Sequence, residues 1–212
     1  MCFSEEVSLS TFFIGTIFGY LAYTIGRPMD KITGFYLFYV SLMQGIEYLL
    51  WRNQKCDLLN INITRLGVLL NNTQPFALAF AIYAFNKNLS KNSLYFILGA
   101  LLCYSCALIP YLYHVYESNI CTLKGTKDDH LNWKWINMKY TGLNYKFYFL
   151  SVTISFLFGL PKYNYFCIFL LYFTYYTSKI FYPNSTGSLW CFYTAFMPLV
   201  YYLFNADLKL MK

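Results

Sequence analysis

Charged side chains are scarce in this sequence. Only 12% of its 212 residues are Asp, Glu, Lys or Arg, whereas 58% are hydrophobic. Because a typical soluble domain carries about 25% charged residues, this balance favours a polytopic membrane protein. The formal net charge of +7 is spread over short polar segments, with no Lys/Arg tract of the kind that binds nucleic acid. We therefore expect the lipid bilayer to be the main partner, and no nucleic acid.

Motifs that would define an enzyme or a cofactor protein are also missing. The two histidines, His114 and His130, lack metal-ligand spacing to a cysteine or an acidic residue, and there is no Gly-rich phosphate loop. The last hydrophobic run contains no lysine that could form a retinal Schiff base. The acidic N-terminus lacks the basic segment of a cleaved signal peptide, so the first hydrophobic run should be retained. We expect no cofactor and no metal, and a non-enzymatic function is favoured.

Long hydrophobic runs are what the sequence contains instead. A membrane span needs about 20 mostly apolar residues and must satisfy its own backbone hydrogen bonds, which makes it helical. We predict one all-α domain over residues 1–212, a bundle of seven transmembrane helices, or six if the fifth and sixth runs are not separate. The runs are Val7–Ile25, Ile32–Trp51, Leu66–Phe85, Ser93–His114, Leu143–Leu160, Tyr165–Phe181 and Gly187–Phe204.

The largest predicted loop outside the membrane covers residues 115–142, between the fourth and fifth runs. It contains Trp133 and Trp135, a spacing typical of a segment that lies in the membrane interface. Two interpretations stay open for this loop. It is either a flexible connector or an ordered lid over a pore or pocket.

The orientation in the membrane is argued from cysteines and from charge. With seven spans, Cys56 and Cys121 lie in loops on the same side as the N-terminus, and a disulfide between them would need an oxidising compartment. The Asn62-Ile63-Thr64 sequon lies on that side too, whereas Asn88-Leu89-Ser90 lies on the other. Lys and Arg are slightly more numerous on the N-terminal side, which favours the opposite orientation. We predict an N-terminus that is outside or lumenal.

The candidate site begins with a carboxylate inside an apolar run. Glu47 follows Gln44 by three residues in the second run, and charge at the centre of a membrane helix costs roughly 2.5–3.5 kcal/mol on insertion scales. The third run carries polar residues at matching depths, so pairs between Glu47 and Asn71 or Asn72, and between Gln44 and Gln74, are geometrically allowed. Pro75 removes a backbone donor beside them. These residues are Gln44, Glu47, Asn71, Asn72, Gln74 and Pro75.

This polar set has two interpretations of similar weight. The amides and one protonated acid could simply hold two helices together, although such bonds average only about 0.6 kcal/mol each in membranes. Alternatively, they form a site for a proton, a cation or a small solute. We favour the site, because five polar side chains and a proline at one level exceed what helix association requires.

A C-x-x-C motif, Cys103 to Cys106, raises the alternative of a membrane thiol oxidoreductase. Reactive cysteines need a lowered thiol pKa, commonly from a helix N-terminus or a nearby cation. Here the pair lies in the middle of an apolar run beside Leu101 and Leu102, where small residues at a helix-packing face are the simpler explanation.

The first third of the chain resembles a known group of proteins. The opening Met1-Cys2-Phe3-Ser4, then Gln44 with Glu47 and Trp51, then Cys56, then Asn71 with Gln74-Pro75, are similar to an uncharacterised family of small multi-span membrane proteins found in large DNA viruses and some protists. Phe3 departs from the Trp that is usual at that position. The resemblance implies a membrane protein and no particular activity.

The sequence thus leads to three functional hypotheses. The first is passage of a small solute, proton or cation through the polar site between the second and third helices. The second is a structural or assembly membrane protein that docks a partner, and the third is the thiol oxidoreductase. The oligomeric state is open, and a homo-oligomer is compatible with the sequence.

Overall fold

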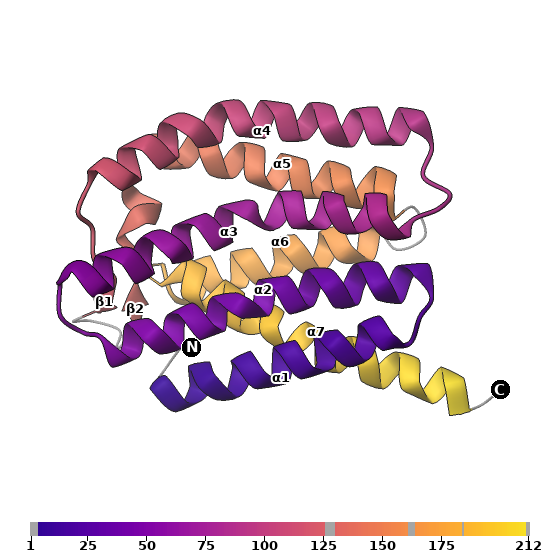
Figure 1. The fold of residues 1–212 in the computed structure, drawn as a ribbon, viewed down its shortest axis with the longest axis horizontal. Coiled ribbons are helices and arrows are strands. Elements are labelled where there is room, and N and C mark those ends of the chain that lie inside the picture. Colours follow the sequence, from indigo (N-terminus) through magenta and orange to yellow (C-terminus); the bar gives the residue numbers. More distant parts are fainter. Residues whose placement is uncertain (1–3, 126–129, 161–163, 184, 211–212) are drawn as a thin grey trace.

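The structure, a computed structural model, describes residues 4–125, 130–160, 164–183 and 185–210, without the side chains of residues 164 and 204–210. Within these ranges the protein is all-α, as predicted, with seven long helices that run alternately in opposite directions (Figure 1). The helices are α1 (Glu5–Thr24), α2 (Pro28–Arg52), α3 (Leu58–Phe85), α4 (Lys91–Glu117), α5 (Thr141–Gly159), α6 (Asn164–Phe181) and α7 (Thr186–Leu210).

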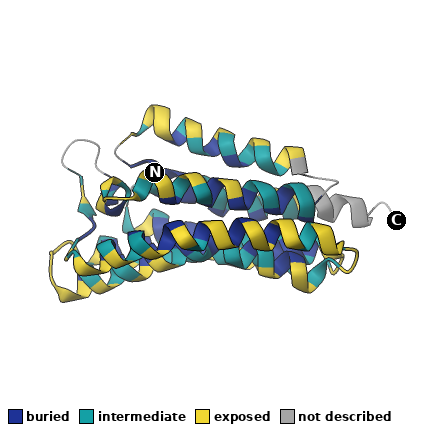
Figure 2. Cartoon of the chain, turned by 90° about the horizontal axis from the view of Figure 1, so that it is seen from above, coloured by how far each residue is buried: buried dark blue, intermediate teal, exposed yellow. Residues whose placement is uncertain are grey.

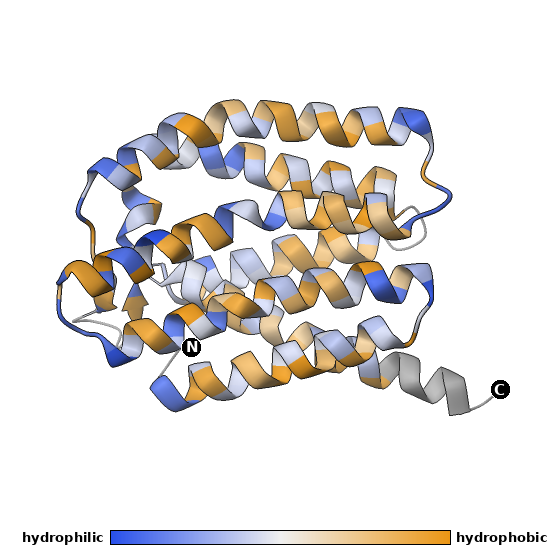
Figure 3. Cartoon of the chain, viewed as in Figure 1, coloured by the Kyte–Doolittle hydropathy of each residue, from blue (hydrophilic) through white to orange (hydrophobic). Residues whose placement is uncertain are grey.

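Three of these helices are long and apolar enough to cross a membrane, among the residues that the structure describes: α1, α3 and α4. This finding is consistent with an integral membrane protein. Figure 3 shows that apolar residues extend along most of each helix, while hydrophilic residues gather toward the turns at the two ends of the bundle. Figure 2 shows buried residues on the inner helix faces and exposed residues on the outer ones.

The start of α3 differs from the prediction because of a capping residue. Asp57 accepts a hydrogen bond of 2.9 Å from the Asn60 backbone N–H, so the helix begins at Leu58, well before the predicted Leu66. This bond, together with one from the Asn53 amide, lowers the pKa of the Asp57 carboxyl. Polar residues at the head of α3 therefore belong to the helix and not to a loop.

The connection between α4 and α5 is ordered where it is described. Two short antiparallel strands, β1 (Leu123–Lys124) and β2 (Leu131–Asn132), precede a 3-10 turn at Lys134–Asn137. Trp133 and Trp135 are only 1% and 0% exposed, and their rings stack 4.6 Å apart. Both indoles are packed into the bundle, where Trp133 abuts Gly187 and Trp135 faces Gly67, so their rings are not presented outward as those of interfacial tryptophans are.

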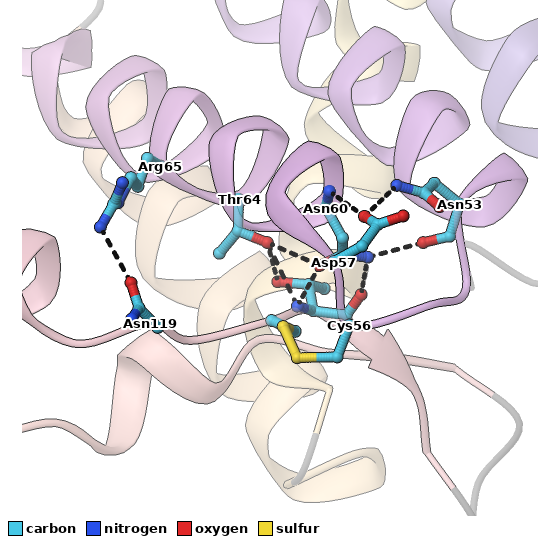
Figure 4. The surroundings of a disulfide bond; sticks show 9 residues. Asn53, Cys56, Asp57, Asn60, Thr64, Arg65 and Asn119 are labelled. Atoms are coloured by element: carbon cyan, nitrogen blue, oxygen red, sulfur yellow. Dashed lines mark hydrogen bonds between the residues drawn. A yellow bond between two sulfur atoms is a disulfide. The ribbon is translucent and has the colours of Figure 1, made fainter.

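A disulfide between Cys56 and Cys121 attaches this connection to the end of the bundle (Figure 4). Beside it, the Asn60 side chain donates to the Thr122 carbonyl at 3.0 Å and accepts from the Thr122 N–H at 3.0 Å. The Thr122 N–H also reaches Thr64 Oγ1, at 3.1 Å. Because these groups are buried, the hydrogen bonds satisfy backbone atoms that would otherwise be costly to remove from water.

Small residues let α1 and α2 approach closely. A Cβ added at Gly34 would lie 2.7 Å from the Gly19 carbonyl oxygen, and one at Gly19 would lie 2.9 Å from the Phe38 nitrogen. Both neighbours are backbone atoms, so they cannot move aside as a flexible side chain can. Close backbone approach of this kind is how helices associate in membranes, where lipid provides no hydrophobic drive between them.

Gly34→Ala should therefore separate α1 from α2 and lower the free energy of unfolding by about 1–3 kcal/mol, because the added methyl group meets backbone. Thermal unfolding of the detergent-solubilised protein, followed by circular dichroism, measures this effect. Gly99→Ala is the matched control, since a Cβ at Gly99 on α4 meets nothing within 4 Å. Equal stability of both variants would contradict the packing described here.

Candidate functional site

All six residues of the predicted site are buried. Gln44 and Glu47 lie on α2 and are 0% exposed, and the remaining four lie on α3. The structure therefore places all six residues inside the bundle. The hydrogen bonds that Gln44 and the three amides of α3 make to other helices, however, go to α1, α4 and α5, which the sequence argument did not include.

Asn72 joins three helices. Its Oδ1 accepts hydrogen bonds from the Tyr104 hydroxyl on α4, at 3.0 Å, and from the Asn144 amide on α5, at 2.8 Å. The Tyr104 hydroxyl lies 2.9 Å from the Asn72 carbonyl oxygen as well. Tyr104 and Asn144 are both 0% exposed, so these contacts replace water for three buried polar groups at once.

The other two amides of α3 bond to tyrosines on α5. The Asn71 amide donates to the Tyr145 hydroxyl at 2.9 Å, and the Tyr148 hydroxyl donates to Gln74 Oε1 at 2.6 Å. Pro75, which follows Gln74, has no N–H, so the backbone carbonyl one turn earlier in α3 receives no bond from this position. The polar face of α3 is therefore directed at α4 and α5.

The predicted pairs between α2 and α3 are not formed. Asn71, Asn72 and Gln74 take the partners just described, and Gln44 Oε1 accepts a bond of 2.9 Å from the Thr11 hydroxyl on α1. Equal depth on adjacent helices was a necessary condition for pairing, but it did not determine which way each helix is rotated. The contact between α2 and α3 includes instead a bond between the hydroxyls of Tyr39 and Thr73, 2.7 Å apart.

The residues that the sequence argument missed share one face of the fifth helix. Asn144, Tyr145 and Tyr148 are spaced as neighbours on a helical surface, and each bonds to one amide of α3. An asparagine followed by tyrosines at the start of an apolar run was the available signal.

A cavity of about 650 Å³ opens between α2, α3, α5, α6 and α7. It extends from Gln74 and Trp190 in the middle of the bundle to Met29 and Tyr201 near the turn between α1 and α2. Its wall is almost entirely apolar, formed by aliphatic and aromatic side chains with a few threonines and cysteines. Gln74 is the member of the predicted set that lines this cavity. Glu47 is not part of its lining.

Charged residues lie just outside one end of the cavity. The Tyr201 hydroxyl donates to Asp30 Oδ1 at 2.7 Å, and the Arg27 guanidinium binds the same carboxylate at 2.6 Å and 2.8 Å. Asp30 is 0% exposed, and these partners supply hydrogen bonds to its buried carboxylate oxygens. The arrangement joins the first turn of α2 to α7 beside the cavity end.

Cys103 and Cys106 are both exposed, on the outward side of α4 and in the middle of its length. In a helix that crosses a membrane this position faces acyl chains and not the aqueous surface. The geometry does not favour the thiol oxidoreductase hypothesis.

Comparisons with protein-family models, with curated proteins and with solved structures found no match for this chain. The resemblance of the first third to viral and protist membrane proteins stays a prediction, and residues 1–3 of its opening motif lie outside the described residues. The class that the fold and the site define is an all-α protein with membrane-length helices and an apolar internal cavity.

Asn72→Leu should lower the free energy of unfolding by about 2–4 kcal/mol, because it leaves the Asn144 amide buried without its acceptor and removes one acceptor of Tyr104. Thermal unfolding in detergent measures the change. Thr73→Val is the control at the adjacent position. It removes the half-buried bond to Tyr39 and the bonds of the Thr73 hydroxyl to carbonyls of its own helix, and it should cost about 0.5–1 kcal/mol. A smaller loss for Asn72→Leu than for Thr73→Val would contradict a connecting role for Asn72.

Proposed function

We propose that this protein is a multi-span membrane protein that takes up a small, predominantly apolar solute in the cavity between α2, α3, α5, α6 and α7. The observation that carries the proposal is the cavity itself. Its volume of about 650 Å³ lies within the range of small-molecule sites, about 300–1,000 Å³, and such sites are typically apolar with a few placed polar groups. Passage of the solute between bilayer and cavity is the activity we assign.

The cavity wall favours an apolar solute over a proton or a cation. Its described lining contains no Asp, Glu, Lys or Arg. An ion in such surroundings would lose its hydration without receiving an opposite charge, which is strongly unfavourable. Glu47, which first suggested an ion site, lies outside the cavity lining. We therefore keep the small solute of the original hypothesis and do not extend the proposal to ions.

We propose seven membrane crossings, a number that the three apolar helices and the connectivity support. α1 and α3 begin at the same end of the bundle (Figure 1), so α2 must return across the membrane between them if both are spans. α5 packs beside α3 and α4, α6 beside α5 and α7, and α7 beside α1 and α2, so we propose that these three helices cross the membrane as well. Large apolar side chains on the outer face of α6, such as Phe169 and Phe173, suit contact with acyl chains.

The disulfide supports an orientation. Cys56 and Cys121 lie at the end of the bundle where α1 begins, and disulfides persist in oxidising compartments. We accordingly propose an outside or lumenal N-terminus, with the turns that precede α2 and α4 on the cytoplasmic side.

Uptake of an apolar solute is tested with a brominated alkane, which quenches tryptophan fluorescence on contact. Trp190 lines the cavity, so the alkane should quench purified wild-type protein in a saturable manner, and Trp190→Phe should abolish that component. Thr194→Phe fills part of the cavity and should weaken binding by about tenfold or more.

Thr16→Phe is the matched control for this experiment. Thr16, like Thr194, bonds to carbonyls of its own helix, but it lies on α1 away from the cavity. Binding that is unaffected by Thr194→Phe, or weakened equally by Thr16→Phe, would refute the assignment of the cavity.

The orientation is tested by cysteine labelling in intact cells with a membrane-impermeant maleimide. Gly142→Cys lies at the disulfide end, where a side chain meets nothing within 4 Å, and should be labelled from outside. Asn88→Cys lies in the exposed turn between α3 and α4 and should react only after permeabilisation. The reverse pattern would invert the proposed orientation.

A further inference from the structure

The cavity contains one buried amide whose orientation is fixed. Gln74 is 2% exposed and lines the cavity, and its Oε1 is occupied by the hydroxyl of Tyr148 at 2.6 Å. Its Nε2 has no hydrogen-bond partner among the described residues. Because Tyr148 holds the oxygen, the amide cannot turn over without losing that bond. The Nε2 atom is itself buried in this cavity-lining residue, and no described residue accepts a hydrogen bond from its N–H groups.

Two other polar groups of the cavity wall are already bonded within the protein. Thr174 Oγ1 donates to the Leu170 carbonyl at 2.7 Å and accepts from Trp190 Nε1 at 3.1 Å. Thr194 Oγ1 lies 2.9 Å from the Cys191 carbonyl of its own helix. Gln74 Nε2 differs from them, since a buried N–H without an acceptor is costly and is satisfied when a ligand supplies one.

We propose that the solute is a neutral, lipid-like molecule whose hydrogen-bond acceptor oxygen, of the ester or ketone type, binds Gln74 Nε2 while its hydrocarbon part fills the rest of the cavity. This inference rests on the proposed function and deepens it. A carboxylate is excluded by the same reasoning that excludes ions, because the described lining offers it no cation. The orientation of the bound solute follows as well. Its oxygen lies in the middle of the bundle, and its hydrocarbon chain extends toward Met29 and Tyr201.

Tyr148 is a positioning residue in this arrangement. Its hydroxyl directs the Gln74 amide, and its ring lies 5.9 Å from that of Trp190, between centroids. A bound oxygen at Gln74 is therefore close to Trp190, which supplies an optical signal for binding near the amide.

The experiment compares two brominated probes of equal chain length, an alkane and a methyl ester with bromine near the ester, through quenching of Trp190. Wild-type protein should bind the ester about five- to tenfold more tightly, which is the effect expected of one neutral hydrogen bond. Gln74→Leu should abolish this preference, because neither probe then meets an N–H donor. Tyr148→Phe should reduce the preference without weakening the alkane.

Thr73→Val is the control, because Thr73 neighbours Gln74 on α3 but does not line the cavity. It should retain the full preference for the ester. Equal affinity of wild type for both probes, or a preference that survives Gln74→Leu, would overturn the assignment of an acceptor oxygen while leaving the proposed function in place. If neither probe quenches Trp190, the proposed function itself fails.

A bilayer lipid offers the same ester chemistry as a free neutral lipid, so one arm separates the two sources. The protein is placed in nanodiscs made of a phospholipid with brominated acyl chains, without any free probe. Trp190 should keep its fluorescence there and lose it when the brominated ester is added. Strong quenching by the phospholipid alone would assign the cavity to a bilayer acyl chain and overturn the proposal of a free solute.

Discussion

Buried amides on α3 are the constraint on which the rest of the bundle depends. A polar side chain that leaves water must find hydrogen bonds inside the protein, and in a membrane no solvent is available to correct an error. Asn71, Asn72 and Gln74 meet this requirement through partners on α4 and α5. These bonds set the rotation of α3 and so determine which side chains face the cavity. Asn71 and Asn72 thus join α3 to α4 and α5, whereas the helix-association interpretation made from the sequence concerned the second and third helices.

The same network has a second consequence at its end. Gln74 belongs both to the polar face of α3 and to the cavity wall, and the hydroxyl of Tyr148 occupies only one of its two polar atoms. One residue therefore combines a structural contact with a polar group that is open to a ligand. An apolar cavity with such a group can select solutes that carry an acceptor oxygen over pure hydrocarbons, and no charged residue has to be buried for this purpose.

The two ends of the bundle are held by different chemistry. At the end where α1 begins, the Cys56–Cys121 disulfide and the bonds of Asn60 to Thr122 hold the connection that carries Trp133 and Trp135. At the opposite end, the contact of Asp30 with Arg27 and Tyr201 joins α2 to α7. The cavity opens beside the second of these ends. A covalent bond therefore stabilises the end of the bundle that is distant from the cavity. The end next to the cavity is stabilised by the polar contacts of Asp30.

The sequence by itself determined the all-α class, the existence of each helix and the burial of Gln44, Glu47 and the polar residues of α3. Hydrophobic runs and helix breakers are local signals. A polar residue within such a run is expected to face the interior of the bundle, because contact with lipid is unfavourable. Only the tertiary structure decided that Asn72 meets Tyr104 and Asn144, that the two loop tryptophans are buried, and that Gln74 reaches a cavity. These contacts depend on how each helix is rotated and on which distant helices pack together. Neither the rotation of a helix nor its distant packing partners can be derived from residue spacing along the chain.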